Sequence, residues 1–333
     1  MTRVAVLGAG GWGTTLADML CARGDEVVLW AYEPEVADEI NRRHRNDLFL
    51  PDSPLQPGLT ATTDAFAAVG GAELVVSAAP SHVMRKVVGE AARGISPDAL
   101  VVSASKGLEP GTHLRMTELL AQVLAPGTAV AALSGPTFAR EVYERQPTAA
   151  VVAAATEAAA KRAQAALAAP HLRLYTNDDV VGVELAGALK NVVAIAAGIL
   201  DGLGMGHNPR AALITRGLAE ITRLGVAMGA RPATFAGLAG MGDLLLTATG
   251  PLSRNRSLGF EVGRGKTLED VVGRRLSVAE GVGTAKAAVE LAAQVGVELP
   301  IAREVVCVLF EGKAAREAIG QLMERSLKSE TWQ

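Results

Sequence analysis

The stretch Val4-Ala5-Val6-Leu7-Gly8-Ala9-Gly10-Gly11-Trp12-Gly13-Thr14-Thr15-Leu16 decides the fold of this chain. Its apolar beginning predicts a buried strand over residues 3–7, and a helix pattern follows the glycines. Gly8, Gly10 and Gly13 have the spacing G-x-G-x-x-G, which is informative when a strand precedes it and a helix follows it. Gly8 permits a tight turn, Gly10 lets the backbone approach a pyrophosphate, and Gly13 allows the helix to pack closely on the strand. The stretch therefore predicts a Rossmann-type βαβ unit that binds a dinucleotide, rather than a glycine-rich turn without a ligand.

The residues near the end of the second predicted strand leave the choice of dinucleotide open. The phosphates of either cofactor would lie on the N–H groups of Gly11 and Trp12, at the positive end of the helix. Glu33, about twenty residues beyond the glycines, can accept a hydrogen bond from the ribose 2′-hydroxyl of NAD. Three nearby arginines can instead offer charge to the 2′-phosphate of NADP: Arg42, Arg43 and Arg45. Tyr32 can pack against the adenine in both cases.

The rest of the chain divides into a part with strands and a part without them. Short apolar runs alternate with helix patterns, which is typical of βαβ units and a parallel sheet. These runs predict strands over 26–30, 74–79, 100–104, 130–133, 148–153 and 172–175. From Asp178 onward only helices are predicted, over 180–203, 210–228, 232–238, 258–262, 268–272, 284–295, 301–310 and 315–327. We therefore expect an α/β fold: a mostly parallel Rossmann domain at 1–179 that binds the dinucleotide, and an all-helical, substrate-binding domain at 180–333.

The composition excludes several classes of partner. The chain is 49% hydrophobic and 20% charged with a net charge of −3, so it has no general attraction for nucleic acid or anionic membranes. Cys21 and Cys307 are far apart within apolar helical patterns, which favours reduced thiols over a disulfide. The five histidines are scattered, so no metal site is predicted. Met1 leads directly into a strand pattern and no apolar run is suited to membrane insertion, so we expect a cytoplasmic protein.

One predicted helix carries a charge in an unusual place. Residues 185–200 are apolar on nearly every face, which predicts a buried helix, yet Lys190 is the only charge between Glu184 and Asp201. A buried ammonium is costly unless it is paired or its pKa falls. Lys190 therefore either extends its side chain to the surface or uses its perturbed proton in a reaction.

Four further clusters contain residues suited to a reaction. They are Ser105-Lys106-Gly107, Ser134-Gly135-Pro136-Thr137-Phe138-Ala139, Gly240-Met241-Gly242-Asp243 and Ser253-Arg254-Asn255-Arg256, of which the last two are expected in loops. Each alone is explained as a turn, a solvated basic loop or a helix cap. Together with the glycine motif they indicate hydride transfer from a secondary alcohol. Lys190 would be the base, Lys106 would lower its pKa or hold the substrate, and Asp243 would orient the ammonium and raise its pKa. Arg254 beside Asn255 suits a phosphate ester.

With these motifs the chain resembles the bacterial NAD(P)-dependent glycerol-3-phosphate dehydrogenases. The motifs keep the family's order and cover most of the chain. They are the glycine motif through Thr15, Phe49-Leu50-Pro51, Ser105-Lys106-Gly107-Leu108-Glu109, Ser134 to Ala139, Glu184 to Asn191, Ala211 to Gly217, Gly240-Met241-Gly242-Asp243-Leu244, Ser253-Arg254-Asn255 and Val278-Ala279-Glu280-Gly281.

The resemblance implies a reaction and a fold. The reaction is the reversible NAD(P)H-dependent reduction of dihydroxyacetone phosphate to sn-glycerol 3-phosphate, which supplies phospholipid synthesis. The helical part would resemble the C-terminal domain of 6-phosphogluconate dehydrogenase. A homodimer is also expected.

The resemblance also implies site residues. Lys190 matches the proton acceptor. The matched substrate contacts are Lys106, Gly135, Thr137, Lys190, Asp243, Ser253, Arg254 and Asn255. The matched cofactor contacts, beyond Gly8, Gly10 and Gly13, are Gly11, Trp12, Tyr32, Phe49, Lys106, Ala139, Arg254, Val278 and Glu280.

The chain departs from the family at a few of these positions. The family often has serine at Gly11, tyrosine at Phe49, and arginine or histidine at Tyr32, so a preference for NADP is not inherited. Two alternatives stay open on the residues alone. One is another lysine-using dehydrogenase of this two-domain type, acting on a hydroxy acid or keto acid. The other is a regulator that binds the dinucleotide without catalysing a reaction.

Overall fold

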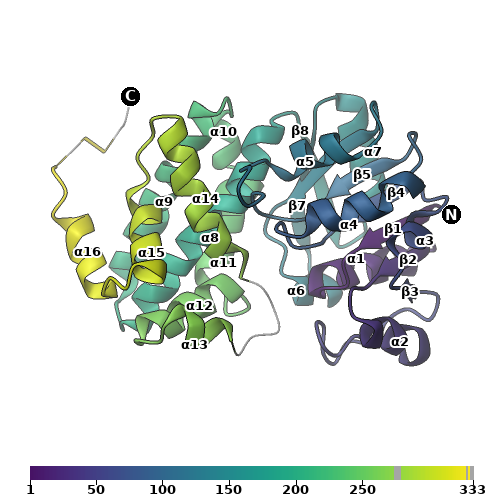
Figure 1. The fold of residues 1–333 in the computed structure, drawn as a ribbon, viewed down its shortest axis with the longest axis horizontal. Coiled ribbons are helices and arrows are strands. Elements are labelled where there is room, and N and C mark those ends of the chain that lie inside the picture. Colours follow the sequence, from purple (N-terminus) through teal and green to yellow (C-terminus); the bar gives the residue numbers. More distant parts are fainter. Residues whose placement is uncertain (274–278, 328, 331–333) are drawn as a thin grey trace.

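The computed structural model describes residues 1–273, 279–327 and 329–330. It contains an eight-stranded sheet, formed by residues 3–177, and the helical half of the chain lies beside it (Figure 1). The strand order is β3-β2-β1-β4-β5-β6-β7-β8, and neighbouring strands are parallel except for the antiparallel pair β6 and β7. The strands are β1 (Arg3–Leu7), β2 (Glu26–Trp30), β3 (Thr60–Thr62), β4 (Leu74–Ser77), β5 (Leu100–Ser103), β6 (Ala129–Ser134), β7 (Thr148–Ala154) and β8 (Leu172–Asn177). The mostly parallel sheet predicted from the sequence is confirmed.

Helices cover both faces of the sheet, because successive strand residues point to opposite sides. In β1, Val4 and Val6 pack on one face with α1 (Gly11–Ala22), α2 (Pro34–Arg43), α6 (Ala139–Tyr143) and α7 (Glu157–Leu167). Ala5 and Leu7 pack on the other face with α3 (Ala65–Val69), α4 (Met84–Ala91) and α5 (Met116–Val123). Burial on both sides explains why these strands are continuous apolar runs.

The second half of the chain is helical around one central helix, α8 (Val180–Gly202). The other helices are α9 (His207–Ala227), α10 (Pro232–Phe235), the π-helical segment η2 (Leu238–Gly242), α11 (Asp243–Thr249), α12 (Arg254–Gly263), α13 (Leu268–Val272), α14 (Glu280–Gln294), α15 (Pro300–Phe310) and α16 (Ala315–Met323). Helix α8 is long and apolar enough to cross a membrane, but 89% of its most apolar window is buried within the protein. It is the core helix that its pattern predicted.

Several local predictions are corrected by the structure. The clusters at 240–243 and 253–256 were expected in loops, but they lie in η2 and at the beginnings of α11 and α12. Ser253 caps α12, because its hydroxyl oxygen accepts a hydrogen bond from the backbone N–H of Arg256 at 3.2 Å. Strand β3 and helices α3, α6 and α11 were not predicted; each has seven residues or fewer, so little periodicity is visible in its sequence.

Glycines bring α8 and α12 unusually close together. The four glycines at the crossing are Gly198 and Gly202 on α8, and Gly259 and Gly263 on α12. A Cβ atom on Gly198 would lie 2.0 Å from the carbonyl oxygen of Arg256, and one on Gly259 would lie 2.0 Å from that of Ile195. The two backbones therefore touch, and this crossing places the beginning of α12 beside the middle of α8.

This crossing generates a prediction about stability. We expect Gly198→Ala to destabilise the protein by roughly 1–3 kcal/mol, because the new methyl group forces the two backbones apart. Thermal unfolding, followed by circular dichroism, measures the change. Gly320→Ala in α16 is the matched control, since nothing lies within 4 Å of its Cβ position. Equal melting temperatures for Gly198→Ala and the parent would contradict the close crossing.

Candidate active site

A cleft of about 1140 Å³ joins the carboxyl edge of the sheet to the helical half of the chain. The glycine loop and the residues that follow β2, β4, β5 and β6 line it from the sheet. Residues of α8, α11 and α12 and the first residue of α14 line it from the helices. Its volume exceeds the usual range for pockets that hold one small ligand, about 300–1,000 Å³, which suits a dinucleotide together with a small substrate.

The glycine loop has the shape that a pyrophosphate needs. Gly8 has a φ of 119°, and a Cβ on Gly13 would lie 1.9 Å from the carbonyl oxygen of Gly8. The Cβ position of Gly10 is open, so a ligand can approach the backbone there. Gly10 is the N-cap of α1 and has no side chain that could accept hydrogen bonds from the first N–H groups of the helix. These N–H groups are therefore free to bind a ligand in the cleft. The loop therefore fits a dinucleotide phosphate.

Asn46 holds this loop in place, and sequence reasoning missed it. Its side-chain amide is fully buried and donates to the carbonyl oxygen of Ala9 and to the hydroxyl of Thr14, both at 2.8 Å. The residue lies 32 positions beyond Thr14, in a segment without an apolar pattern, so no local signal pointed to it.

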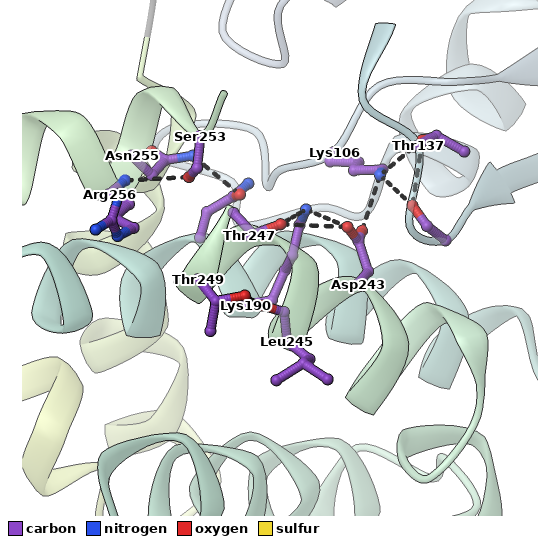
Figure 2. Close-up of polar contacts among 12 residues, drawn as sticks. Lys106, Thr137, Lys190, Asp243, Leu245, Thr247, Thr249, Ser253, Asn255 and Arg256 are labelled. Carbon is purple, nitrogen blue, oxygen red and sulfur yellow. Dashed lines mark hydrogen bonds and ion pairs between the residues drawn. The ribbon is translucent and has the colours of Figure 1, made fainter. Parts of the chain in front are cut away.

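Lys190 is buried in α8, with an exposed fraction of 5%, and its ammonium is paired. Its Nζ donates to Asp243 Oδ1 at 2.6 Å and to Thr247 Oγ1 at 2.6 Å (Figure 2). Burial lowers the pKa of Lys190 from 10.5 to about 8, while Asp243 raises it and the charge on Lys106 lowers it. The side chain lines the cleft, so its perturbed proton is accessible to a ligand there.

Asp243 connects Lys190 to a second lysine, Lys106. The carboxylate has an exposed fraction of 1%, and its other oxygen, Oδ2, accepts from Lys106 Nζ at 2.8 Å (Figure 2). Lys106 follows β5 and also donates to the carbonyl oxygen of Gly135 at 2.9 Å and to Thr137 Oγ1 at 3.4 Å. We call Lys190, Asp243 and Lys106 the lysine–aspartate cluster. Because it contains two cationic groups and one carboxylate, it favours an anionic or polarised ligand in the cleft.

A second polar group lies beside this cluster, between α8 and the beginning of α12. Asn255 Nδ2 donates to Asn191 Oδ1 at 3.0 Å, and Asn255 Oδ1 accepts from the backbone N–H of Gly281 at 3.0 Å. Arg254, in the first turn of α12, is exposed and lines the cleft. Asn191 and Thr247 were missed by sequence reasoning. Asn191 is adjacent to Lys190 in the sequence, and Thr247 lies one helical turn after Asp243, so their spacing from predicted site residues could have identified both.

Glu280 is the acidic residue on the same side of the cleft. It begins α14 and is half-buried. Burial raises the pKa of its carboxyl above the ordinary value, while the charges of Arg254 and Lys106 lower it. Val278, which was predicted to contact the cofactor, lies outside the described residues.

The structure brings most of the predicted site residues to this one cleft. Those that line it are Gly8, Gly10, Gly11, Trp12, Gly13, Tyr32, Phe49, Lys106, Thr137, Ala139, Lys190, Ser253, Arg254, Asn255 and Glu280. Gly135 and Asp243 are joined to it through Lys106. The three arginines considered for a 2′-phosphate do not line it, and Arg42 and Arg45 form ion pairs with Asp38 and Asp47.

Comparison with known proteins gives consistent results over the whole chain. The family model described as the N-terminus of NAD-dependent glycerol-3-phosphate dehydrogenase matches residues 3–160, and the model of its C-terminus matches residues 179–320. A protein of Geobacter sp. (strain M21) named glycerol-3-phosphate dehydrogenase [NAD(P)+] is 54% identical over 98% of both chains. One of the same name from Koribacter versatilis is 51% identical over 100% of both. The crystal structure of glycerol-3-phosphate dehydrogenase from Coxiella burnetii has a TM-score of 0.93 and 37% identity, covering 97% of this chain and 99% of that one.

The lysine–aspartate cluster predicts opposite changes of the Lys190 pKa in two variants. We expect Asp243→Asn to move it below 8, because the carboxylate favours the charged ammonium. We expect Lys106→Met to move it above 8, because a neighbouring positive charge is removed. Titration of the lysine side-chain signals by NMR measures both values. Shifts in the same direction in the two variants would contradict the electrostatic arrangement.

Proposed function

The chain belongs to the NAD(P)-dependent glycerol-3-phosphate dehydrogenases, and from this premise we propose that it reversibly reduces dihydroxyacetone phosphate to sn-glycerol 3-phosphate. As a member of this family it is an oxidoreductase whose cofactor is NAD or NADP. The observation that supports the reaction is the lysine–aspartate cluster, since it lies in the same cleft as the glycine loop. A base and a dinucleotide site in one cleft are what oxidation of a secondary alcohol requires.

The cofactor would be held by the sheet side of the cleft. Gly11 and Trp12 offer backbone N–H groups at the beginning of α1 to the pyrophosphate. We propose further contacts with Gly8, Gly10, Gly13, Tyr32, Phe49, Lys106, Ala139, Arg254, Val278 and Glu280. When bound, the nicotinamide ring exchanges a hydride with the carbon that carries the reacting oxygen.

Lys190 would carry the proton in both directions. In alcohol oxidation the neutral amine accepts the proton of the substrate hydroxyl, and in carbonyl reduction the ammonium donates it to the carbonyl oxygen. A pKa of about 8 keeps both forms populated near neutral pH, which is the condition for efficient general acid–base catalysis. Asp243 and Thr247 hold the Nζ atom in one position, so its direction toward the cleft is set before the substrate arrives.

The phosphate of the substrate would bind at the beginning of α12. Arg254 lines the cleft there, next to Ser253 and Asn255. The guanidinium is a fork-shaped donor suited to phosphate oxygens, and the positive end of a helix adds to the attraction. Lys106, Gly135, Thr137 and Asp243 would surround the reacting end.

We also propose the setting in which this reaction works. The product would supply phospholipid synthesis, in the cytoplasm, and the protein would act as a homodimer. Residues 1–179 would form the cofactor domain and residues 180–333 the substrate domain, since the last strand ends at Asn177 and α8 begins at Val180.

Lys190→Ala tests the proposed base. We expect the turnover number with dihydroxyacetone phosphate to fall by roughly 10²–10⁴-fold, which is the usual contribution of a general acid or base. Cofactor affinity, measured by the fluorescence of bound NADH or NADPH, is expected to stay close to that of the parent. Lys161→Ala, on the exposed face of α7, is the matched control. Turnover of Lys190→Ala within about tenfold of the parent would rule out the role.

Arg254→Ala tests the proposed phosphate contact. We expect the KM for dihydroxyacetone phosphate to rise roughly tenfold or more, because a charge-assisted hydrogen bond is lost. Arg256→Ala is the control from the same helix, since Arg256 pairs with Asp201 and does not line the cleft. An unchanged KM in Arg254→Ala would place the phosphate elsewhere.

A further inference from the structure

The end of the cleft beyond β2 differs in charge from the end that contains Lys190, and we infer that it selects NAD over NADP through Glu33. This inference rests on the proposed function and names the cofactor for it. An acidic residue at the end of the second strand of a dinucleotide fold is positioned to reach the adenosine ribose. The two cofactors differ only at that ribose, which carries a 2′-hydroxyl in NAD and a 2′-phosphate in NADP.

Glu33 lines the cleft with a carboxylate that is ready to accept a hydrogen bond. The residue directly precedes α2 as its N-cap, and its side chain makes no capping hydrogen bond. Its carboxylate has no hydrogen-bond or ion-pair partner among the residues that the structure describes. A ribose hydroxyl can donate to this carboxylate, whereas an ionised 2′-phosphate has no proton to donate and is repelled.

The first turn of α2 is also unsuited to a phosphate. Helix beginnings attract anions through their free N–H groups, but Pro34 occupies the first position and has no N–H. Glu35 adds a second carboxylate in the same turn. This helix end therefore lacks the features by which other helix ends bind phosphate.

The arginines of α2 and the following loop do not compensate for these carboxylates. Arg42 lies in the last turn of α2, which at 1.5 Å per residue is about 12 Å along the axis from Pro34. Its Nε is 2.7 Å from Asp38 Oδ1, and Arg45 Nη2 is 2.8 Å from Asp47 Oδ1. Neither Arg42, Arg43 nor Arg45 lines the cleft.

The nearest rival for a phosphate is Lys86 on α4. It lines the cleft and is exposed, but Glu90 lines the cleft one helical turn later on the same face. The carboxylates of Glu33 and Glu90 thus oppose the single ammonium of Lys86. Two carboxylates and one ammonium therefore stand at this end, and the guanidinium of Arg140, which also lines the cleft, is engaged by Ser53 and Pro51. A 2′-phosphate would bring up to two further negative charges.

The test compares NADH with NADPH in the full-length protein and in matched variants. We expect kcat/KM with dihydroxyacetone phosphate to be at least tenfold higher for NADH in the parent. Glu33→Gln is expected to reduce this ratio roughly tenfold, because the charge is removed while the shape is kept. Glu35→Gln removes the same charge from a position that does not line the cleft, so the ratio should change by less than about threefold. Lys86→Gln should likewise change the NADH-to-NADPH ratio of kcat/KM by less than about threefold.

Each result either supports the inference or overturns it. A parent that prefers NADPH, an unchanged ratio in Glu33→Gln, or a selective loss of NADPH activity in Lys86→Gln would overturn it. If neither cofactor supports turnover, the proposed function fails, yet the selectivity is still decided by the two dissociation constants from cofactor fluorescence. Tighter binding of NADH that weakens only in Glu33→Gln supports the inference even in that case.

Discussion

A single buried carboxylate holds the centre of this molecule together. Asp243 accepts from Lys190 on one oxygen and from Lys106 on the other, so it joins the core helix of one half to a strand end of the other. Removing a carboxylate and an ammonium from water costs several kcal/mol per ion, and only close geometry with further hydrogen bonds offsets this. Thr247, Gly135 and Thr137 provide those bonds. The same burial that makes the cluster costly is what brings the pKa of Lys190 to about 8.

The helix crossing and this cluster belong to one arrangement. Backbone contact between α8 and α12 at Gly198 and Gly259 sets the distance between the two helices. One to two turns before the crossing on α8, Asn191 accepts from Asn255 of α12, which keeps the beginning of α12 beside Lys190. A packing feature of the core thereby places Arg254, at the beginning of α12, on the same cleft as Lys190. The chemistry proposed for the cleft therefore depends on glycines that do not line it.

The sheet contributes the other half of the cleft through its topology. Strands β1, β2, β4, β5 and β6 are parallel, so the loops that follow them reach the same edge. The glycine loop, Glu33, Lys106 and Thr137 come from four of these loops. The order of the strands spreads these loops along that edge, so the cleft is long. The carboxylate of Glu33 stands near one end of it, and the ammonium of Lys106 stands near the other.

Local pattern in the sequence determined the class of fold, the glycine loop and the unusual position of Lys190. Each of these depends on residues within one strand, one turn or one helix, where periodicity and glycine spacing are visible. The same reasoning interpreted the beginnings of α11 and α12 as loops and missed β3, because short elements carry too few residues to show a period.

The residue types suggested that Asp243 orients the Lys190 ammonium, but only the tertiary structure decided how the charges meet, with one oxygen of Asp243 on each lysine. Asp243 lies 53 residues from Lys190 and 137 residues from Lys106, and Arg42 and Arg45 turned out to be paired away from the cleft. The physical reason is that a side-chain contact depends on how helices and strands pack, and packing joins residues whose spacing along the chain carries no signal.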